Sequence, residues 1–133
     1  MRTVLLIEDD RILADILGEA VEAEGFQCLV HYAAGDAEAE FSRLGTEIAA
    51  VILDLMMTRS GTFAKAPPSA CETGDEIYER IRKLAPTLPV IIITAKRKES
   101  LMTRYATDKY AHVFYKPIDE DASNRIISII KKL

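Results

Sequence analysis

Long apolar runs, basic charge and cysteine are all scarce in this sequence, and each scarcity argues against a class of protein. No apolar run approaches the roughly 18 residues that would span a bilayer, and no leader peptide is recognisable, so we expect a soluble, cytoplasmic protein without membrane insertion. The 17 Lys and Arg residues are outnumbered by 21 Asp and Glu residues, and the net charge of −4 argues against direct binding of nucleic acid. A length of 133 residues suits one domain with a substantial core.

The cysteines and histidines do not form a recognisable metal or nucleophilic site. Cys28 and Cys71 lack metal-type spacing, and we interpret them as free thiols in a reducing compartment, with a disulfide between them as the alternative. His31 and His112 fall in strand-like segments and have no matching nucleophile. The sequence also lacks a Gly-rich phosphate loop and a dinucleotide fingerprint, so a metabolic enzyme is not expected.

Short apolar runs alternate along the chain with longer segments of helical period. The runs that we expect to be strands are residues 3–7, 27–31, 49–53, 90–93 and 112–115. The segments that we expect to be helices are residues 11–24, 36–44, 75–84, 99–107 and 119–133. The runs are continuously apolar rather than alternating, which predicts strands buried on both faces, as in a parallel sheet. This alternation predicts one doubly wound α/β domain.

The spacing of apolar residues predicts which side of each helix faces inward. For the first helix, the residues expected to point inward are Ile12, Ile16, Leu17 and Ala20. For the third helix they are Ile77, Ile81 and Leu84. Gly25 is a candidate helix stop, and Asp36 is a candidate acidic cap for the second helix.

Polar side chains follow four of the predicted strands at the point where each strand ends. These residues are Glu8, Asp9 and Asp10 after the first strand, Asp54 after the third, Thr94 after the fourth, and Lys116 with Pro117 after the fifth. The carboxyl ends of parallel strands share one edge of the sheet, where ligands bind in such folds, so we expect these groups to converge. Each residue alone also has an ordinary explanation as a cap, a strand residue or a surface dipeptide.

The chemistry of this set favours phosphoryl transfer. Neighbouring carboxylates repel one another unless a cation neutralises them, and Mg²⁺ suits such oxygen ligands. An Asp carboxylate can attack a phosphoryl group and form an acyl phosphate. Phosphoryl transfer chiefly needs positioning and charge neutralisation, which Mg²⁺, the ammonium of Lys116 and the hydroxyl of Thr94 would supply.

The segments LLIEDD, VILDLMM, VIIITA and VFYKP, in this order and at these strand ends, resemble the receiver domain of two-component response regulators. The resemblance spans nearly the whole chain and implies a flavodoxin-like sheet of strand order 2-1-3-4-5. It implies that Asp54 is the phosphoacceptor. It also implies that Asp9 directly, and Glu8 more plausibly through water, hold Mg²⁺ together with Asp54 and the backbone carbonyl of Met56.

The resemblance assigns further roles at the ends of the fourth and fifth strands. Thr94 would move its hydroxyl toward the phosphoryl oxygens, and Lys116 would pair with them. The Lys116–Pro117 peptide bond would be cis, which general X-Pro bonds are in only about 5% of cases. The output surface would comprise the fourth helix, which contains Tyr105, together with the fifth strand and fifth helix.

Several features around the predicted site distinguish this chain within the family pattern. Val113 stands where the family usually places an aromatic switch residue, and we read it as a core residue or, alternatively, as part of a modified switch. Met56 offers no carboxylate or amide to orient a hydrolytic water, so we expect a longer-lived phosphoryl group than in the fastest members. Ala95 is small and leaves the pocket accessible. Gly74 comes late, which implies an extended loop inserted at about 57–73, either functional or a tolerated surface insertion.

These features predict a phosphorylation-dependent signalling switch. A sensor histidine kinase or a phosphotransfer protein would donate the phosphoryl group to Asp54 with Mg²⁺ bound, and a downstream protein target or output domain would respond. A phosphorylation-dependent dimer is a further expectation. Catalysis would extend at most to the chain's own aspartyl phosphorylation and dephosphorylation. The alternative is a receiver-like interaction module that is never phosphorylated, and the receiver could stand alone or belong to a longer protein.

Overall fold

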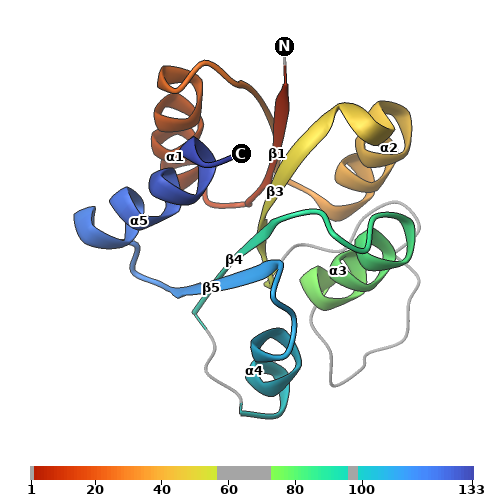
Figure 1. Ribbon diagram of the computed structural model, residues 1–133. Helices are drawn as coiled ribbons and strands as arrows, with labels where there is room; N and C mark the ends of the chain where they lie inside the picture. Colours follow the sequence, from red (N-terminus) through yellow and green to blue (C-terminus); the bar gives the residue numbers. More distant parts are fainter. Residues whose placement is uncertain (1, 57–72, 96–98) are drawn as a thin grey trace.

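Five parallel strands form one sheet in the order β2-β1-β3-β4-β5, with helices on both faces (Figure 1). The structure is a computed structural model that describes residues 2–56, 73–95 and 99–133. The strands are β1 Thr3–Ile7, β2 Gln27–His31, β3 Ile48–Asp54, β4 Val90–Thr94 and β5 Ala111–Tyr115. The helices are α1 Arg11–Ala23, α2 Ala34–Leu44, α3 Thr73–Leu84, α4 Glu99–Ala106 and α5 Glu120–Lys131, with a short 3-10 helix, η1, at Gly45–Glu47. The expected fold class and strand order are confirmed.

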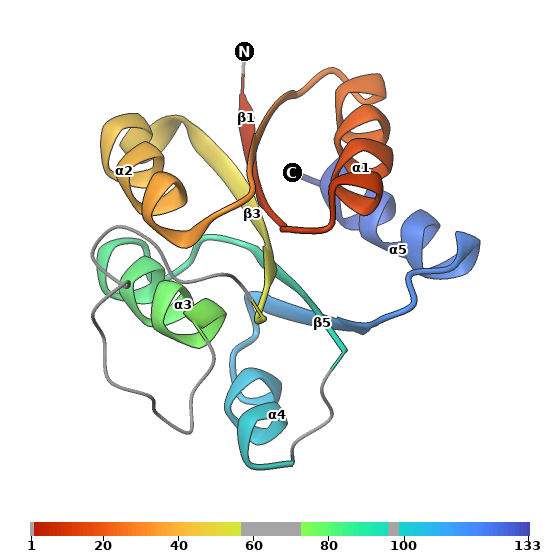
Figure 2. The ribbon, with the colours of Figure 1, turned by 180° about the vertical axis from the view of Figure 1, so that it is seen from behind.

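Side chains that alternate along the strands build a separate core on each face of the sheet. One core joins strand residues such as Leu5 and Val51 to α2, α3 and α4. The other joins residues such as Val4 and Ile52 to α1 and α5, which Figures 1 and 2 show together on one side of the sheet. Every residue of β1, β3 and β4 is buried, as their continuous apolar runs predicted.

The prediction of burial on both faces is wrong for the two edge strands. Most residues of β2 and β5 are only half-buried. An edge strand has a hydrogen-bonded neighbour on one side only, so the helices cover it less completely than they cover the sheet centre.

The predicted inward face of α1 is wrong for Ile12 and Ile16 and right for Leu17, which is fully buried. Ile12 and Ile16 are 75% and 55% exposed. The stripe that α1 buries consists of Ala14, Leu17, Gly18 and Val21, which have the i, i+3, i+4, i+7 spacing of a helix face. In α3, Leu84 is 68% exposed although it was expected to point inward, because it lies in the last turn beyond the edge of the core.

The helix ends follow the capping rules in most cases. The side chains of Asp10 and Asp119 accept hydrogen bonds from backbone N–H groups at the starts of α1 and α5. Gly25 follows α1 with φ of 90°, a conformation that glycine adopts without strain. The expected cap at Asp36 is wrong, because α2 begins two residues earlier, its N-cap is Ala33, and Asp36 lies in the first turn.

The predicted insertion at about 57–73 lies almost entirely outside the described residues, since only Thr73 is described and it already belongs to α3. Cys28 has a free thiol, whereas Cys71 lies outside the described residues. Among the helices in the described part of the chain, none is long and apolar enough to cross a membrane.

Candidate functional site

Three carboxylates meet at the carboxyl edge of the sheet. Glu8 and Asp9 follow β1, and Asp54 is the last residue of β3. One oxygen of each lies within 4.8 Å of the others. Glu8 and Asp54 are buried, with 0% and 1% exposure, whereas Asp9 is exposed. The cluster forms because β1 and β3 are adjacent and parallel, with Ile7 paired to Leu53, so that the residues after each pair emerge side by side.

Lys116 places its ammonium group between two of these carboxylates. The Nζ atom donates to Glu8 Oε1 at 2.5 Å and to Asp54 Oδ2 at 3.1 Å. Lys116 directly follows β5, and its backbone N–H donates to the carbonyl oxygen of Thr94 at 2.8 Å, which fixes the lysine at the end of β4. The Lys116–Pro117 peptide bond is cis, as the family resemblance implied.

The cluster is electrostatically unusual because a buried acid lies beside a second acid. Burial raises the pKa of Glu8 to about 8, the neighbouring Asp54 carboxylate adds to the rise, and Lys116 opposes it. Although burial lowers the pKa of Lys116, its contacts with Glu8 and Asp54 hold that pKa above the ordinary value. One ammonium group therefore faces two buried carboxylates, and the site favours additional positive charge.

The donor set fits a hard divalent cation. Among the described residues, Glu8 Oε2 is buried without a hydrogen-bond partner, although a buried carboxylate oxygen normally has one. Glu8 belongs to the same cluster as Asp9 and Asp54. An ion such as Mg²⁺ uses one or two carboxylates and retains several waters, which this partly open cluster allows.

The other predicted site residues lie at the same edge of the sheet. Thr94 is fully buried as the last residue of β4, and the exposed Ala95 follows it. The backbone N–H of Met56 donates to Asp54 Oδ1 at 2.9 Å, so this turn holds the carboxylate in position. Met56 is 40% exposed.

Gly74 brings the start of α3 directly against the candidate phosphoacceptor. Its N–H donates to the carbonyl oxygen of Leu55 at 2.9 Å. A Cβ atom at Gly74 would lie 2.3 Å from Leu55 Cα and 2.5 Å from the Asp54 carbonyl oxygen. The sequence indicated a glycine at the start of this helix but not the close approach that requires it.

Val113 and Tyr105 do not join the acidic cluster. Val113 is half-buried and packs against the core beneath α2, α3 and α4, in which Tyr105 is also buried. The following residue, Phe114, belongs to the core on the opposite face. The ring of Tyr105 meets that of Tyr78 on α3 edge to face, with ring centroids 4.8 Å apart.

Sequence reasoning missed polar contacts that tie α3 to α4 and to the turn that follows α4. Arg82 Nε and the Tyr78 hydroxyl both donate to Asp108 Oδ2, the former at 2.6 Å. Arg104 on α4 forms an ion pair with Glu79 on α3. Because the two residues of each contact are far apart in the sequence, no local sequence pattern predicts these contacts.

Comparisons with known proteins agree with this geometry. The family model described as "Response regulator receiver domain" matches residues 4–128. The chain is 33% identical over 99 residues to "Sensory transduction protein RegX3" of Mycobacterium bovis, an alignment that covers 74% of this chain and 37% of that protein. It is 32% identical over 99 residues to "Transcriptional regulatory protein CpxR" of Escherichia coli, covering 74% of this chain and 36% of that protein. The chain thus spans little more than a third of the length of these curated relatives.

Solved structures share the fold. The receiver domain of HemR from Leptospira biflexa, solved in the non-phosphorylated form, matches with a TM-score of 0.77 and 22% identity, covering 100% of this chain and 96% of that chain. The receiver domain of a LuxO-type repressor from Vibrio parahaemolyticus matches with a TM-score of 0.73 and 23% identity, covering 99% and 92%. The chain therefore belongs to the response regulator receiver domain family of two-component signalling systems.

Proposed function

We propose that this receiver accepts a phosphoryl group on Asp54 in a Mg²⁺-dependent reaction, in the cytoplasm. The observation that carries the proposal is the position of Lys116 Nζ, 3.1 Å from Asp54 Oδ2 and 2.5 Å from Glu8 Oε1. An ammonium group there can pair with the oxygens of an incoming phosphoryl group. Residues 1–133 would form one receiver domain, with an insertion between β3 and α3 within 57–73.

Each proposed step uses a group of this chain. An Asp54 carboxylate oxygen attacks the phosphorus atom of the donor, the bond from phosphorus to the donor breaks, and the leaving group departs with the bonding electrons. Glu8, Asp9, Asp54 and the Met56 carbonyl would hold Mg²⁺, which supplies charge to neutralise the phosphoryl oxygens. Lys116 contributes a second positive charge. Catalysis would extend at most to this self-phosphorylation and to hydrolysis of the acyl phosphate, in which water releases inorganic phosphate and restores the Asp54 carboxylate.

Thr94 and Ala95 are the proposed start of the switch. The Thr94 hydroxyl would turn toward the phosphoryl oxygens, and the small Ala95 beside it would leave room for the group. The loop after β4 would move with Thr94, and this movement would be passed on to α4. The proposed output surface is α4, β5 and α5, and it would bind a downstream target, an output domain or a second phosphorylated copy. Size-exclusion chromatography with and without a phosphodonor tests the last of these.

The mass of the intact chain after incubation with acetyl phosphate and Mg²⁺ tests the central proposal. We expect a gain of one phosphoryl group that chelation of Mg²⁺ suppresses and Asp54→Asn abolishes. Asp10→Asn is the matched control, because Asp10 is exposed, caps α1, and asparagine caps helices equally well. No gain in the unaltered chain, or an undiminished gain in Asp54→Asn, would refute the proposal.

The protein donor would be a sensor histidine kinase or a phosphotransfer protein docking beside Lys116. A hollow there is lined in part by Ile12, Ile16 and Pro117. Both isoleucines lie on α1 and are large apolar residues that are exposed to solvent. We expect Ile16→Asp to slow phosphorylation by the protein donor but not by acetyl phosphate. Equal slowing with both donors would place the defect in the site rather than in docking.

Met56 predicts the lifetime of the acyl phosphate. Its thioether cannot orient a water molecule for hydrolysis as a carboxylate or an amide can. We therefore expect Met56→Asn to shorten the lifetime of the phosphorylated chain, measured by following the decay of its mass after removal of the donor. Loss of the group within seconds in the unaltered chain would contradict this expectation.

The alternative function is an interaction module that is never phosphorylated. The observation that favours it is Val113, which provides no aromatic ring at the usual switch position. Under this alternative, partner binding is unchanged by Asp54→Asn and by acetyl phosphate. The mass measurement therefore separates the two functions before any partner is known.

A further inference from the structure

Arg104 on α4 reaches two acidic residues of α3 at once. Its Nη2 atom forms an ion pair with Glu79, and its Nη1 atom lies 3.9 Å from Asp75 Oδ1. Asp75 and Glu79 are four residues apart, so they lie on the same face of α3. A guanidinium group presents its N–H donors as a planar fork, which can serve two carboxylates at the same time. One side chain thus joins α4 to two successive turns of α3.

Two aromatic rings lie beside the same guanidinium group. Its central carbon atom is 5.4 Å from the centroid of the Tyr78 ring on α3 and 5.8 Å from that of the Tyr105 ring on α4. A ring attracts a cation that lies within about 6 Å of its centroid. Because the Arg104 side chain is only 28% exposed, water and salt screen these attractions less than at the open surface. Ion pairs and ring contacts therefore act at one point between the two helices.

The α3 end of this contact lies next to the candidate phosphoacceptor. Asp75 is buried and directly follows Gly74. The N–H of Gly74 donates to the carbonyl oxygen of Leu55 at 2.9 Å, and Leu55 directly follows Asp54. The backbones are so close that a Cβ atom at Gly74 would lie 2.5 Å from the Asp54 carbonyl oxygen. Arg104 therefore ties α4 to the part of α3 that contacts the backbone of Asp54.

We propose that the contacts of Arg104 with Asp75 and Glu79 form a latch, which holds α4 against α3 in the unphosphorylated chain and opposes the switch. The inference rests on the proposed function, in which the movement of the loop after β4 is passed on to α4. An interaction that stabilises only the resting state lowers the population of the state that phosphorylation favours. Release of the latch should therefore speed phosphorylation, whereas loss of a merely structural contact would slow it or leave it unchanged.

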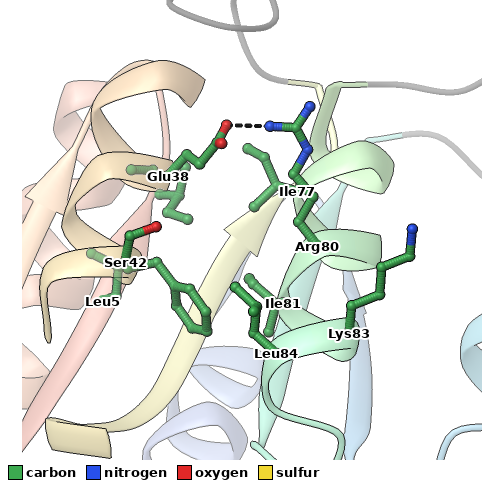
Figure 3. A pocket seen from close by; sticks show the side chains of 11 residues that line it. Leu5, Glu38, Ser42, Ile77, Arg80, Ile81, Lys83 and Leu84 are labelled. Atoms are coloured by element: carbon green, nitrogen blue, oxygen red, sulfur yellow. Dashed lines mark hydrogen bonds and ion pairs between the residues drawn. The ribbon is translucent and has the colours of Figure 1, made fainter. Parts of the chain in front are cut away.

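Hydrogen exchange of the unphosphorylated full chain tests the latch without any phosphoryl group. Arg104→Gln should raise the exchange rates of the α4 amides about two- to fivefold, the modest effect expected of a partly exposed ion pair. Arg80→Gln is the matched control, because Arg80 on α3 pairs with Glu38 on α2 instead, at 2.5 Å (Figure 3). It should leave the α4 amides unchanged. Unchanged α4 exchange in Arg104→Gln, or equal increases in both variants, would overturn the proposal.

The rate of phosphorylation by acetyl phosphate and Mg²⁺ tests the coupling of the latch to Asp54. Arg104→Gln should be phosphorylated about two- to fivefold faster than the unaltered chain, measured from the mass of the intact chain over time. Arg80→Gln should keep the rate of the unaltered chain. An equal or slower rate in Arg104→Gln, with normal phosphorylation of the unaltered chain, would overturn the latch and leave the proposed function standing. No phosphorylation of the unaltered chain would overturn both.

A milder variant, Glu79→Gln, covers the case in which Arg104→Gln does not fold. The Glu79 side chain is 51% exposed, and its replacement leaves the contact of Arg104 with Asp75 in place. We expect α4 exchange and the phosphorylation rate to rise as in Arg104→Gln, but by less. Glu38→Gln, which removes the acid of the α2–α3 ion pair, is the control for this variant. Equal α4 exchange and equal phosphorylation rates in Glu79→Gln and Glu38→Gln would overturn the proposal.

Discussion

Replacing Gly74 by alanine should destabilise the fold even though Gly74 lies inside a helix. In an exposed helix, this replacement stabilises by about 1 kcal/mol because alanine has the higher helix propensity. At Gly74, however, the new Cβ would lie 2.3 Å from Leu55 Cα, 2.5 Å from the Asp54 carbonyl oxygen and 2.8 Å from the Leu55 carbonyl carbon. All three are backbone atoms, which cannot rotate away as the end of a side chain can.

The expected magnitude follows from three opposing contributions. Overpacking of a tight site destabilises by about 1 to 3 kcal/mol. Displacing α3 also weakens the hydrogen bond of 2.9 Å from Gly74 N to Leu55 O, which contributes about 1 kcal/mol. Subtracting the gain in helix propensity leaves a net destabilisation of about 1 to 3 kcal/mol. Because Asp54 itself must shift, phosphorylation by acetyl phosphate should slow as well.

Gly18 in α1 is the matched control. It is also a buried helical glycine, but a Cβ there would meet Val30 Cγ2 at 3.6 Å and Cys28 Sγ at 3.8 Å, which are ordinary contacts. We expect Gly18→Ala to stabilise by about 0.5 to 1 kcal/mol and to leave phosphorylation unchanged. Urea unfolding followed by circular dichroism measures both variants. A Gly74→Ala chain as stable as the unaltered one, or equal losses in both variants, would refute the steric argument.

Two further perturbations test other parts of the structure. Burial, together with the nearby Glu22 charge, raises the pKa of Cys28 to about 12. In a Cys71→Ser chain, the alkylation rate of Cys28 should therefore rise about tenfold per pH unit from pH 7 to 10, because only the thiolate reacts. A plateau of that rate near pH 9 would contradict this. Although burial raises the pKa of Asp108, hydrogen bonds from Tyr78 and Arg82 hold it below the ordinary value. The resulting stabilisation of the fold is present above the ordinary Asp pKa and is lost as the pH falls through the lowered pKa of Asp108. Asp108→Asn should therefore destabilise the fold by about 1 to 2 kcal/mol at pH 7 and by less at pH 3.

Most of the fold could be predicted from the sequence because the strands of a parallel sheet have a strong local signature. The central strands are continuously apolar, and their neighbours in space follow from the family resemblance. The faces of the helices were harder to predict. In α1 the prediction included Leu17 correctly but also the large apolar side chains of Ile12 and Ile16, whereas the buried stripe is completed by Val21 and by small residues.

The candidate site was predictable for a different reason, which is topology. Glu8, Asp54 and Lys116 are far apart in the sequence, yet the ends of parallel strands share one edge, so their convergence needed no side-chain detail. The steric demand at Gly74 depends instead on how closely α3 approaches the end of β3, and the contact of Arg82 with Asp108 depends on how α3 lies against the turn after α4. No local pattern encodes a distance between two such segments, and these features require coordinates.

Val113 shows how packing changes the route by which a signal can leave the site. A valine has no ring that could rotate inward if the Thr94 hydroxyl moves as proposed, so β5 has no aromatic switch residue at this position. The same core contains the aromatic ring of Tyr105 on α4, which meets the Tyr78 ring of α3. Under the proposed switch, a movement at the end of β4 that reaches the proposed output surface would have to displace α4, against the Arg104–Glu79 ion pair and the Tyr78–Tyr105 ring contact that hold it to α3. The stability of the α3–α4 contact would then limit how far phosphorylation shifts the switch.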